Sequence, residues 1–372
     1  MQPARLLLCL LPWFLSPPAG AQQPTDEDLS TWVKHLSDDS YTARLVARER
    51  LLQYAERGAE ESEAVEARLR QPVSPRRDLE SYLARRSLLQ AMAQVSERRR
   101  LDRFLHDPAF DRDRLEGWSA FRRHAGDDSV SRRLFATIFQ RFPDQLQRLS
   151  DSQSASLIQP PETLDRNDSA AWAMALVAAC ESHEQHLGEN TFRLVSALRC
   201  FGTGPLPNSE GERHVIKRLV GAYLQTSPAD VRDRMTIGVR FECREQTLQL
   251  CRLVLDDPSQ SPSATVTAML AASALEGPSE TIDAWIQRYG TDSRTSHVWR
   301  SLVEPKTTRR TQVRDVAAAL QLHREGRDPR EHGFTALIAD PILVFQAYSL
   351  GFASEQERQE AQRQRISIRS DR

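Results

Sequence analysis

The residues best suited to chemistry in this sequence are cysteines and histidines near the middle of the chain. Cys180, His183 and His186 follow one another at intervals of three residues, and Cys200 lies a short distance downstream. Thiolate and imidazole are ligands that zinc prefers, so these four residues could form a tetrahedral metal site. On a helix, however, residues i and i+6 point about 120° apart, so the three side chains of the run converge poorly. The polar end of a helix is the favoured interpretation, and we predict no metal ligand.

Four cysteines lie beyond the first 21 residues, an even number that permits two disulfides in an oxidising compartment. Cys243 and Cys251 would be about 12 Å apart on one continuous helix, which is too far for a disulfide. Cys180 and Cys200 fall on neighbouring predicted helices joined by a short turn, so they are the best candidate pair. Buried free thiols are nevertheless the favoured interpretation.

An acidic cluster made by Asp111, Asp113 and Glu116 has some features of a calcium loop. Arginines intervene, and the mid-loop glycine and third oxygen ligand of an EF-hand are missing, so the acid-rich start of a helix is the better interpretation. The sequence also has no nucleophile elbow, no glycine-rich phosphate loop and no zincin helix motif. We therefore predict no catalytic residue, no cofactor and no enzymatic activity.

The first 21 residues are typical of a cleavable secretory signal peptide. Arg5 supplies a positive charge, residues 6–15 form an apolar run that Pro12 interrupts, and residues 19–21 are Ala-Gly-Ala. The apolar run is too short to cross a bilayer, which takes about 20 residues, and no later run is long enough either. We expect export to the periplasm, the cell envelope or the medium, without stable membrane insertion after cleavage.

The charges of the chain nearly cancel, with 50 basic and 51 acidic side chains. This balance argues against a dedicated surface for nucleic acid or for anionic membranes. A hydrophobic content of 40% suffices for a core, while 27% charged and 7% aromatic residues suit an array of helices better than a compact β fold.

Helical periodicity begins soon after the signal peptide. Apolar residues from Leu29 to Leu36 recur at i, i+3, i+4 and i+7, which indicates one helix face. The polar run 38–40 then supplies an N-cap for a helix that extends from Tyr41 to about Arg57. Its inward-facing residues are expected to be Leu45, Leu51, Leu52 and Ala55. Two further helices are predicted over 60–70 and 77–95.

The segment from Ser37 to Leu51 resembles the second-helix signature of a HEAT repeat, in which an acidic turn precedes the pattern Val/Ala-Arg-x-x-Ala-x-x-x-Leu. Thr311–Ala317 resembles the same signature, and it is continued by His323-x-x-Gly326 and by His332-Gly333-Phe334. Together with the signal peptide, these segments resemble exported bacterial HEAT-like (armadillo-type) repeat proteins of unassigned function.

This resemblance implies an all-α fold, a right-handed α-solenoid of helix pairs. It extends over 27–100 and 305–355 and departs from the repeat pattern over 108–165. It assigns structural repeat positions to Arg44, Ala47, Leu51, Val313, Arg314 and Ala317. In this pattern the alanine lets helices approach closely, the leucine fills the shared core and the arginine bonds to carbonyls or acids nearby. We predict that Arg314 is buried along its stem and paired.

The remaining sequence predicts short helices in pairs, for example 279–289 with 311–324, and very little strand. The run Ile338–Tyr348 looks extended but could equally be a helix that starts after Pro341, and the polar tail from Glu355 is expected to fray. The predicted parts are a signal peptide (1–21), N-terminal HEAT-like helices (22–105), an irregular helical segment and linker (106–167), a helical-repeat domain (168–355) and a polar tail (356–372).

A solenoid with no catalytic signature suggests an exported scaffold or adaptor that binds protein partners of unknown identity. This hypothesis depends on analogy at the level of the fold. The alternative is an exported enzyme or metal-binding protein with a site near Cys180 and Cys200.

Overall fold

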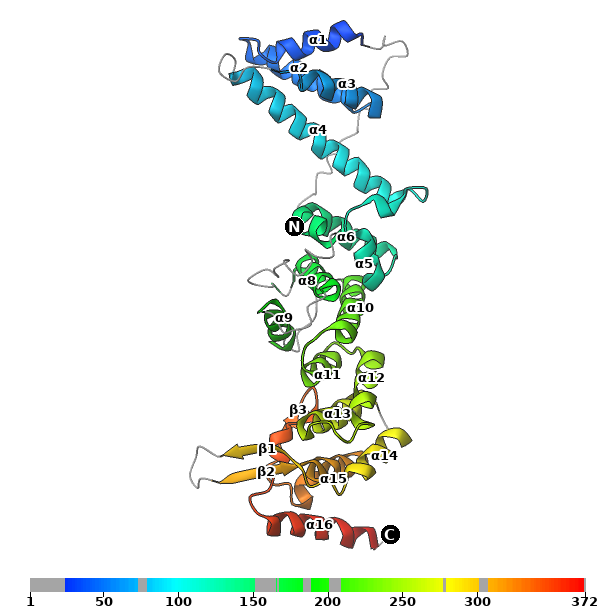
Figure 1. Ribbon diagram of the computed structural model, residues 1–372, viewed down its shortest axis with the longest axis vertical. Coiled ribbons are helices and arrows are strands. Elements are labelled where there is room, and N and C mark those ends of the chain that lie inside the picture. The colour runs from blue at the N-terminus through cyan, green and yellow to red at the C-terminus, as the bar shows by residue number, and fades with distance from the viewer. Residues whose placement is uncertain are drawn as a thin grey trace, which may run out of the picture. The chain divides into compact units, whose positions relative to one another are not determined.

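The computed structural model describes residues 24–72, 79–150, 165, 167–182, 189–200, 209–276, 279–300 and 307–370. Within these ranges the chain is mostly helical and has two small antiparallel sheets, which confirms the predicted all-α class (Figure 1). The chain divides into two compact units, unit 1 up to Asp107 and unit 2 from Pro108 onward. The predicted signal peptide lies outside the described residues.

Unit 1 is built from long amphipathic helices. They are α1 (Asp26–His35), α2 (Tyr41–Ala55), α3 (Ala59–Leu69) and α4 (Leu79–His106). A capping box between Thr25 and Asp28 starts α1, and the Ser40 hydroxyl accepts a hydrogen bond from the Ala43 N–H at the start of α2. The core includes Leu29, Leu51, Val65, Leu69 and Leu88.

The sequence predicted that Leu45 faces the core and that the fourth helix ends at residue 95. Both predictions are wrong. Leu45 is 42% exposed, because the buried stripe of α2 passes through Ala47, Leu51 and Ala55 and Leu45 lies about 200° around the helix from Ala47. Helix α4 continues beyond residue 95 to His106, since no helix-breaking residue interrupts the segment between them.

Unit 2 begins with a 3-10 turn, η1 (Arg112–Arg114), and continues as a series of helices that follow one another largely in chain order (Figure 1). They are α5 (Trp118–Ala125), α6 (Ser129–Arg141), α7 (Pro143–Ser150), α8 (Ser169–Glu181), α9 (Glu189–Cys200), α10 (Glu210–Thr226), α11 (Val231–Arg240), α12 (Arg244–Leu255), α13 (Pro262–Leu275), α14 (Glu280–Tyr289), α15 (Val313–Arg324) and α16 (Glu355–Ser370).

Two alanine-rich helices form the centre of unit 2. Helix α8 is buried on almost every face and packs against α6 and α10, while α13 packs against α11, α12 and α15. Helices that are apolar all round are buried helices, whereas the helices around them bury one stripe each. Helices α5 and α6 therefore share a core with α8 and α10.

An acidic cap connects α6 to α10. The carboxylate of Asp128 accepts hydrogen bonds from the N–H groups of Val130 and Ser131 at the start of α6, and it also pairs with Arg218 on α10. Burial opposes ionisation of Asp128, but the Ser131 N–H and Arg218 outweigh it and lower its pKa to about 2.

The sheets lie in the C-terminal part of unit 2. Strands β1 (Thr295–Arg300) and β2 (Thr308–Gln312) pair antiparallel, with Trp299 opposite Arg309, and β2 leads directly into α15. Strands β3 (Ala339–Asp340) and β4 (Val344–Phe345) form a second, shorter pair. The β1–β2 hairpin was not predicted from the sequence, whereas the second pair lies in the run Ile338–Tyr348, for which an extended conformation was one of two interpretations.

Of the two interpretations of the run Ile338–Tyr348, the extended one holds over β3 and β4, and no helix starts directly after Pro341. The Asp340 carboxylate accepts hydrogen bonds from the N–H groups of Ile342 and Leu343, at 2.8 and 2.9 Å, and so closes a turn between β3 and β4. The chain then forms a single 3-10 turn, η4 (Ala347–Leu350).

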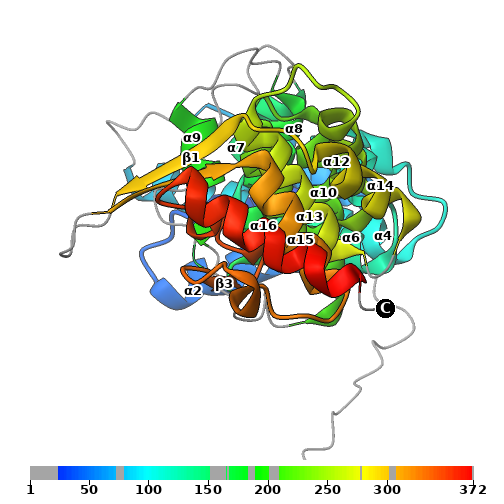
Figure 2. The same cartoon turned by 90° about the horizontal axis from the view of Figure 1, so that it is seen from below.

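The C-terminal residues also differ from the prediction, because the segment expected to fray forms α16. Figure 2 shows α16 beside α15. Although the sequence of α16 is polar, the helix makes a buried contact. In this contact Arg358 Nε donates a hydrogen bond to Asp315 Oδ1 at 2.8 Å. Arg358 Nη2 also donates to the carbonyl of Arg310 in β2 at 2.9 Å. These bonds join α16 to α15 and to β2.

Candidate protein-interaction surface

Cys180 and Cys200 are free thiols in the structure. No disulfide joins Cys180 at the end of α8 to Cys200 at the end of α9. Burial raises the pKa of the Cys180 thiol to about 12, so the sulfur stays protonated at neutral pH. His183 and His186 lie outside the described residues, so the metal hypothesis stays untested. Across the described ranges, no group of three His, Cys, Asp or Glu side chains is arranged to hold a metal.

The other two cysteines are buried thiols. Cys243 contacts the carbonyl of Lys217 at 3.4 Å, and Cys251 lies 3.7 Å from the sulfur of Met235. Burial raises the pKa of each thiol to about 12. Both are therefore inert at neutral pH and contribute to packing.

The acidic cluster does not converge on a cation site. Asp111 pairs with Arg114 at 3.1 Å, and Asp113 pairs with Arg122 at 3.2 Å. These acids flank and occupy the 3-10 turn η1, so the predicted acid-rich helix start is a shorter element than expected.

The repeat positions of unit 1 have structural contacts. Ala47 and Leu51 are buried in the core, and Arg44 donates a hydrogen bond to the carbonyl of Asp38 at 2.7 Å. In unit 2, Val313 and Ala317 are buried on α15. These positions therefore hold helices together.

Arg314 joins α15 to α16. Its side chain is 20% exposed, and Nη2 donates to Glu355 Oε1 at 2.8 Å while Nε donates to Gln312 Oε1 at 2.6 Å. The expected burial and pairing are present, but the acid comes from the segment that was expected to fray.

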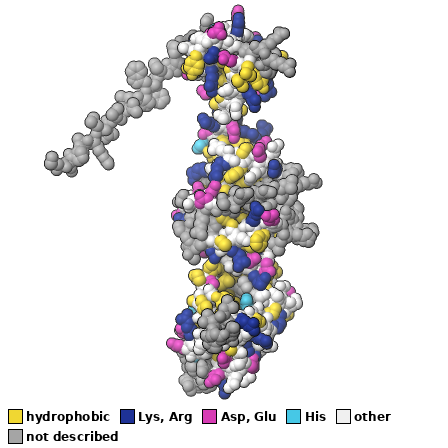
Figure 3. Space-filling model, turned by 90° about the vertical axis from the view of Figure 1, so that its left-hand side faces the viewer, with side chains coloured by type: hydrophobic (Ala, Val, Ile, Leu, Met, Phe, Trp, Pro, Cys, Tyr) yellow, Lys and Arg dark blue, Asp and Glu magenta, His cyan; other side chains and the backbone are white. Residues whose placement is uncertain are grey.

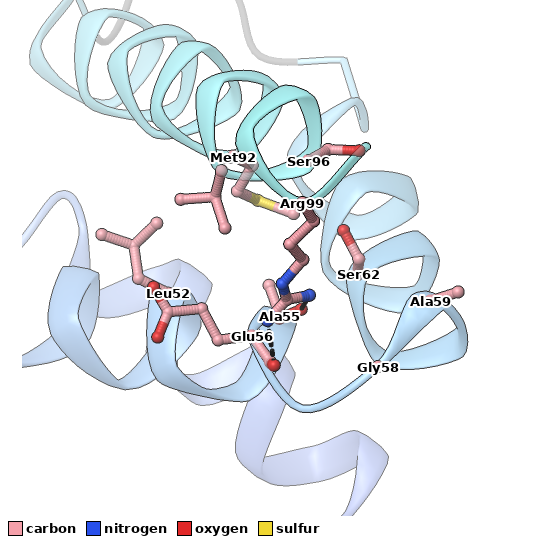
Figure 4. Close-up of a pocket in the computed structure, with 10 residues that line it drawn as sticks. Leu52, Ala55, Glu56, Gly58, Ala59, Ser62, Met92, Ser96 and Arg99 are labelled. Atoms are coloured by element: carbon pink, nitrogen blue, oxygen red, sulfur yellow. Dashed lines mark hydrogen bonds between the residues drawn. The ribbon is translucent and has the colours of Figure 1, made fainter. Parts of the chain in front are cut away.

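A small cavity of about 200 Å³ lies between α2, α3 and α4 (Figure 4). Leu52, Ala55 and Met92 give it an apolar side. Arg99 reaches from α4 across the cavity and donates hydrogen bonds to the carbonyls of Ala55 and Glu56 at the end of α2. An arginine at a helix C-terminus stabilises the unpaired carbonyls there, so Arg99 has a structural role. The cavity is smaller than the usual ligand pocket of 300 Å³ or more.

A larger hollow of about 390 Å³ in unit 2 has both acids and arginines around it. Its most buried acid, Glu181, accepts hydrogen bonds from Arg123 at 2.8 Å and from His124 Nε2 at 2.7 Å. These bonds fix α5 against α8. The arrangement is that of a structural carboxylate held by two donors.

The β1–β2 hairpin of unit 2 carries an exposed aromatic contact. Trp299 on β1 stacks on Tyr348 of η4, with ring centroids 6.4 Å apart and an angle of 26° between the ring planes. The two residues are 39% and 38% exposed. Val298 is 64% exposed and, by strand alternation, lies on the opposite face of the hairpin from Trp299.

The base of the hairpin is firmly attached to unit 2. Arg310 and Phe352 exchange backbone hydrogen bonds of 3.0 and 3.2 Å, and Arg309 donates to the carbonyl of Gly351 at 3.3 Å. Thr311 is buried. The exposed aromatic pair therefore stands on a rigid support.

Basic side chains lie on both faces of the hairpin, with Arg309 on the face of the aromatic pair and with Arg300 and Arg310 on the opposite face. Arg300, Arg309 and Arg310 lie on the two strands, and neither strand contains an acid. Figure 3 looks onto the side from which the hairpin projects, and apolar and basic side chains lie close together on this face of unit 2. We call Val298, Trp299, Arg300, Arg309, Arg310 and Tyr348 the hairpin surface.

The hairpin surface was not predicted from the sequence. Its local signal was Thr295–Arg300 and Thr308–Gln312, two runs rich in β-branched residues that flank Pro305. This pattern is typical of a strand, a loop and a second strand.

Comparisons with known family models, with curated proteins and with solved structures give no significant match. In the described parts of the chain, no helix combines the length and the apolar character needed to cross a bilayer.

Proposed function

We propose that this chain is an exported scaffold that binds a protein partner through the hairpin surface of unit 2. The stacked and exposed pair of Trp299 and Tyr348 supports this proposal most directly. Tryptophan, tyrosine and arginine are the residues that contribute most binding energy at protein interfaces. Trp299, Tyr348 and Arg309 lie together on one face of the hairpin, on a support that is already ordered, so a partner would bind without paying to fold it.

Other exposed apolar side chains in unit 2 differ from this group. Leu253 on α12 is exposed but does not belong to an aromatic and basic cluster of this kind. Single exposed apolar residues are normal on protein surfaces. Leu253 is therefore a matched control for the hairpin.

The proposal includes a HEAT-like arrangement of the helices. Its support is the bond from Arg44 to the carbonyl of the preceding turn, the burial of Ala47 and Leu51, and the succession of helices in unit 2 that pack against their neighbours. Such arrays expose a large surface relative to their length, which suits binding to proteins.

The proposal also includes export to the periplasm or cell envelope, or secretion. Its support is the sequence of residues 1–21, with one basic residue, an apolar run and a small-residue triplet.

Co-purification from the native envelope tests the function. Three forms of the full chain serve as bait: the unchanged protein, the Trp299→Ala/Tyr348→Ala variant and the Leu253→Ala variant. We expect the same partner with the unchanged protein and with Leu253→Ala, and its loss with the double variant. Equal recovery with all three forms, or no protein recovered in a stoichiometric amount, would reject the hairpin surface as the binding site.

A further inference from the structure

The hairpin has one open edge. In the described residues, β1 pairs with a single strand, β2, whereas the far edge of β2 is bridged to Phe352. The outer half of β1, from Val298 to Arg300, is exposed and projects past the helices of unit 2 (Figure 2). Backbone N–H and C=O groups on an unpaired strand edge can bond to a further strand.

One face of the hairpin carries two arginines, Arg300 on β1 and Arg310 on β2. Arg300 and Arg310 are both exposed, and neither has an ion-pair partner among the residues that the structure describes. The register places Val298 opposite Arg310 and Arg300 opposite Thr308, so these four residues share one face of the hairpin. An acid near this face would gain two cations that no described residue neutralises.

We propose that the outer half of β1 binds an extended, acidic segment of a partner protein by strand addition. This inference rests on the proposed function and names its partner's chemistry. Backbone hydrogen bonds to β1 hold the segment, while alternate side chains face the two sides of the hairpin. On one side an apolar residue contacts Val298 and carboxylates pair with Arg300 and Arg310. On the other side a side chain packs on the Trp299–Tyr348 pair.

A second copy of the chain is a poorer occupant of this edge. Parallel, in-register pairing of β1 with β1 of another molecule would place Arg300 beside its own copy, and like charges directly opposite each other are destabilising. An acidic segment has the opposite charge and avoids this repulsion.

Selection from a phage-displayed library of random peptides tests the inference on the full mature chain. We expect the selected peptides to be rich in Asp and Glu at alternate positions, with apolar residues between them. Synthetic copies should bind about tenfold more weakly to the Arg300→Glu/Arg310→Glu variant, since reversal replaces attraction with repulsion. Arg252→Glu, at an exposed position on α12, should bind like the unchanged protein.

Hydrogen exchange separates strand addition from simple charge attraction. A bound synthetic peptide should slow exchange of backbone amides within 295–300 and leave α12 unchanged. Selected peptides without acids, equal binding to both charge variants, or binding without protection of β1 would each overturn the inference. A single-stranded oligonucleotide that displaces the peptide and protects β1 equally well would also overturn it, in favour of nucleic acid.

The two proposals fail separately. Loss of envelope partners with Trp299→Ala/Tyr348→Ala, combined with no protection of β1 by peptides, would retain the binding surface and reject strand addition. Retention of the same partners by that variant would reject the surface itself.

Discussion

Arg358 and Asp315 form the most deeply buried ion pair in the described part of the chain, with side chains only 5% and 1% exposed. The Arg358 guanidinium also lies over the ring of Phe352, 5.4 Å from its centroid. Gln312 N–H donates to the second oxygen of Asp315 at 2.8 Å. Because every one of these groups is buried with a partner, removal of one leaves the others unsatisfied.

Arg358→Ala should therefore lower the free energy of unfolding by about 3–5 kcal/mol, since it leaves a buried carboxylate without its cation. Chemical denaturation followed by circular dichroism measures the change. Arg252→Ala, on the exposed face of α12, is the control and should change stability by less than about 0.5 kcal/mol. Equal stability of the two variants would mean that the α16 contact does not hold in solution.

The loss of stability in the Arg358→Ala variant should depend on pH. Burial raises the pKa of the Asp315 carboxyl in the folded protein, although Arg358 and the Gln312 N–H pull it down. An acid whose folded pKa is raised contributes stability at low pH that is lost as the pH rises. Without Arg358 the pKa of Asp315 rises further. The loss of unfolding free energy caused by Arg358→Ala should therefore be largest at pH 7 and shrink toward about pH 4. A deficit that is the same at both pH values would contradict this explanation.

At the scale of single residues, the sequence predicts the burial and pairing of some side chains and not of others. Arg314 could be placed because it follows a turn and precedes an apolar stripe at helical spacing. Arg358 could not, because it sits among glutamines and glutamates whose polarity suggests solvent on all sides. Its burial depends on Asp315, 43 residues earlier, and no local pattern indicates that distance.

Helix α2 is the element in which periodicity is most informative. Leu51→Ala should lower the stability of unit 1 by about 2–5 kcal/mol, because it opens a cavity in the core. Leu45→Ala, on the same helix but 42% exposed, is the matched control and should have a much smaller effect. Denaturation midpoints compare the two variants. A similar shift for both would show that α2 packs in a different orientation.

The β1–β2 hairpin depends on a close backbone approach at Gly351. A Cβ atom at this position would lie 2.8 Å from backbone atoms of Arg310 and Thr311, a distance that real Cβ atoms do not adopt. Gly351→Ala should therefore separate η4 from β2 and disturb the Trp299–Tyr348 stack. Near-ultraviolet circular dichroism should show a changed aromatic signal, while far-ultraviolet helix content stays the same. An unchanged aromatic signal would contradict the proposed support of the hairpin.

The two hairpins show why some secondary-structure elements could not be predicted from the sequence. A helix prediction from apolar spacing works for α2 and α15, whose buried residues recur along one face. Strands β3 and β4 have two residues each, too few for any period to appear. Their position is set by the turn at Asp340 and by packing against the rest of unit 2.

For the whole molecule, the all-α class followed from composition and periodicity, but the division into two compact units and the docking of α16 required the structure. Export is a separate prediction at this scale. The mature protein purified from its native cells should begin near Gln22, because the small residues 19–21 precede a signal-peptidase site. Intact-mass spectrometry measures this directly. A mass that includes residues 1–21 would reject cleavage.

The central claim is that the hairpin surface contacts a partner protein. Site-specific photo-crosslinking in native cells tests it most directly, with a photoreactive amino acid at position 299 in one variant and at position 253 in another. We predict one dominant crosslinked protein at position 299, formed through a segment rich in Asp and Glu, and no such product at position 253. The same products at both positions, or none at position 299, would contradict the claim.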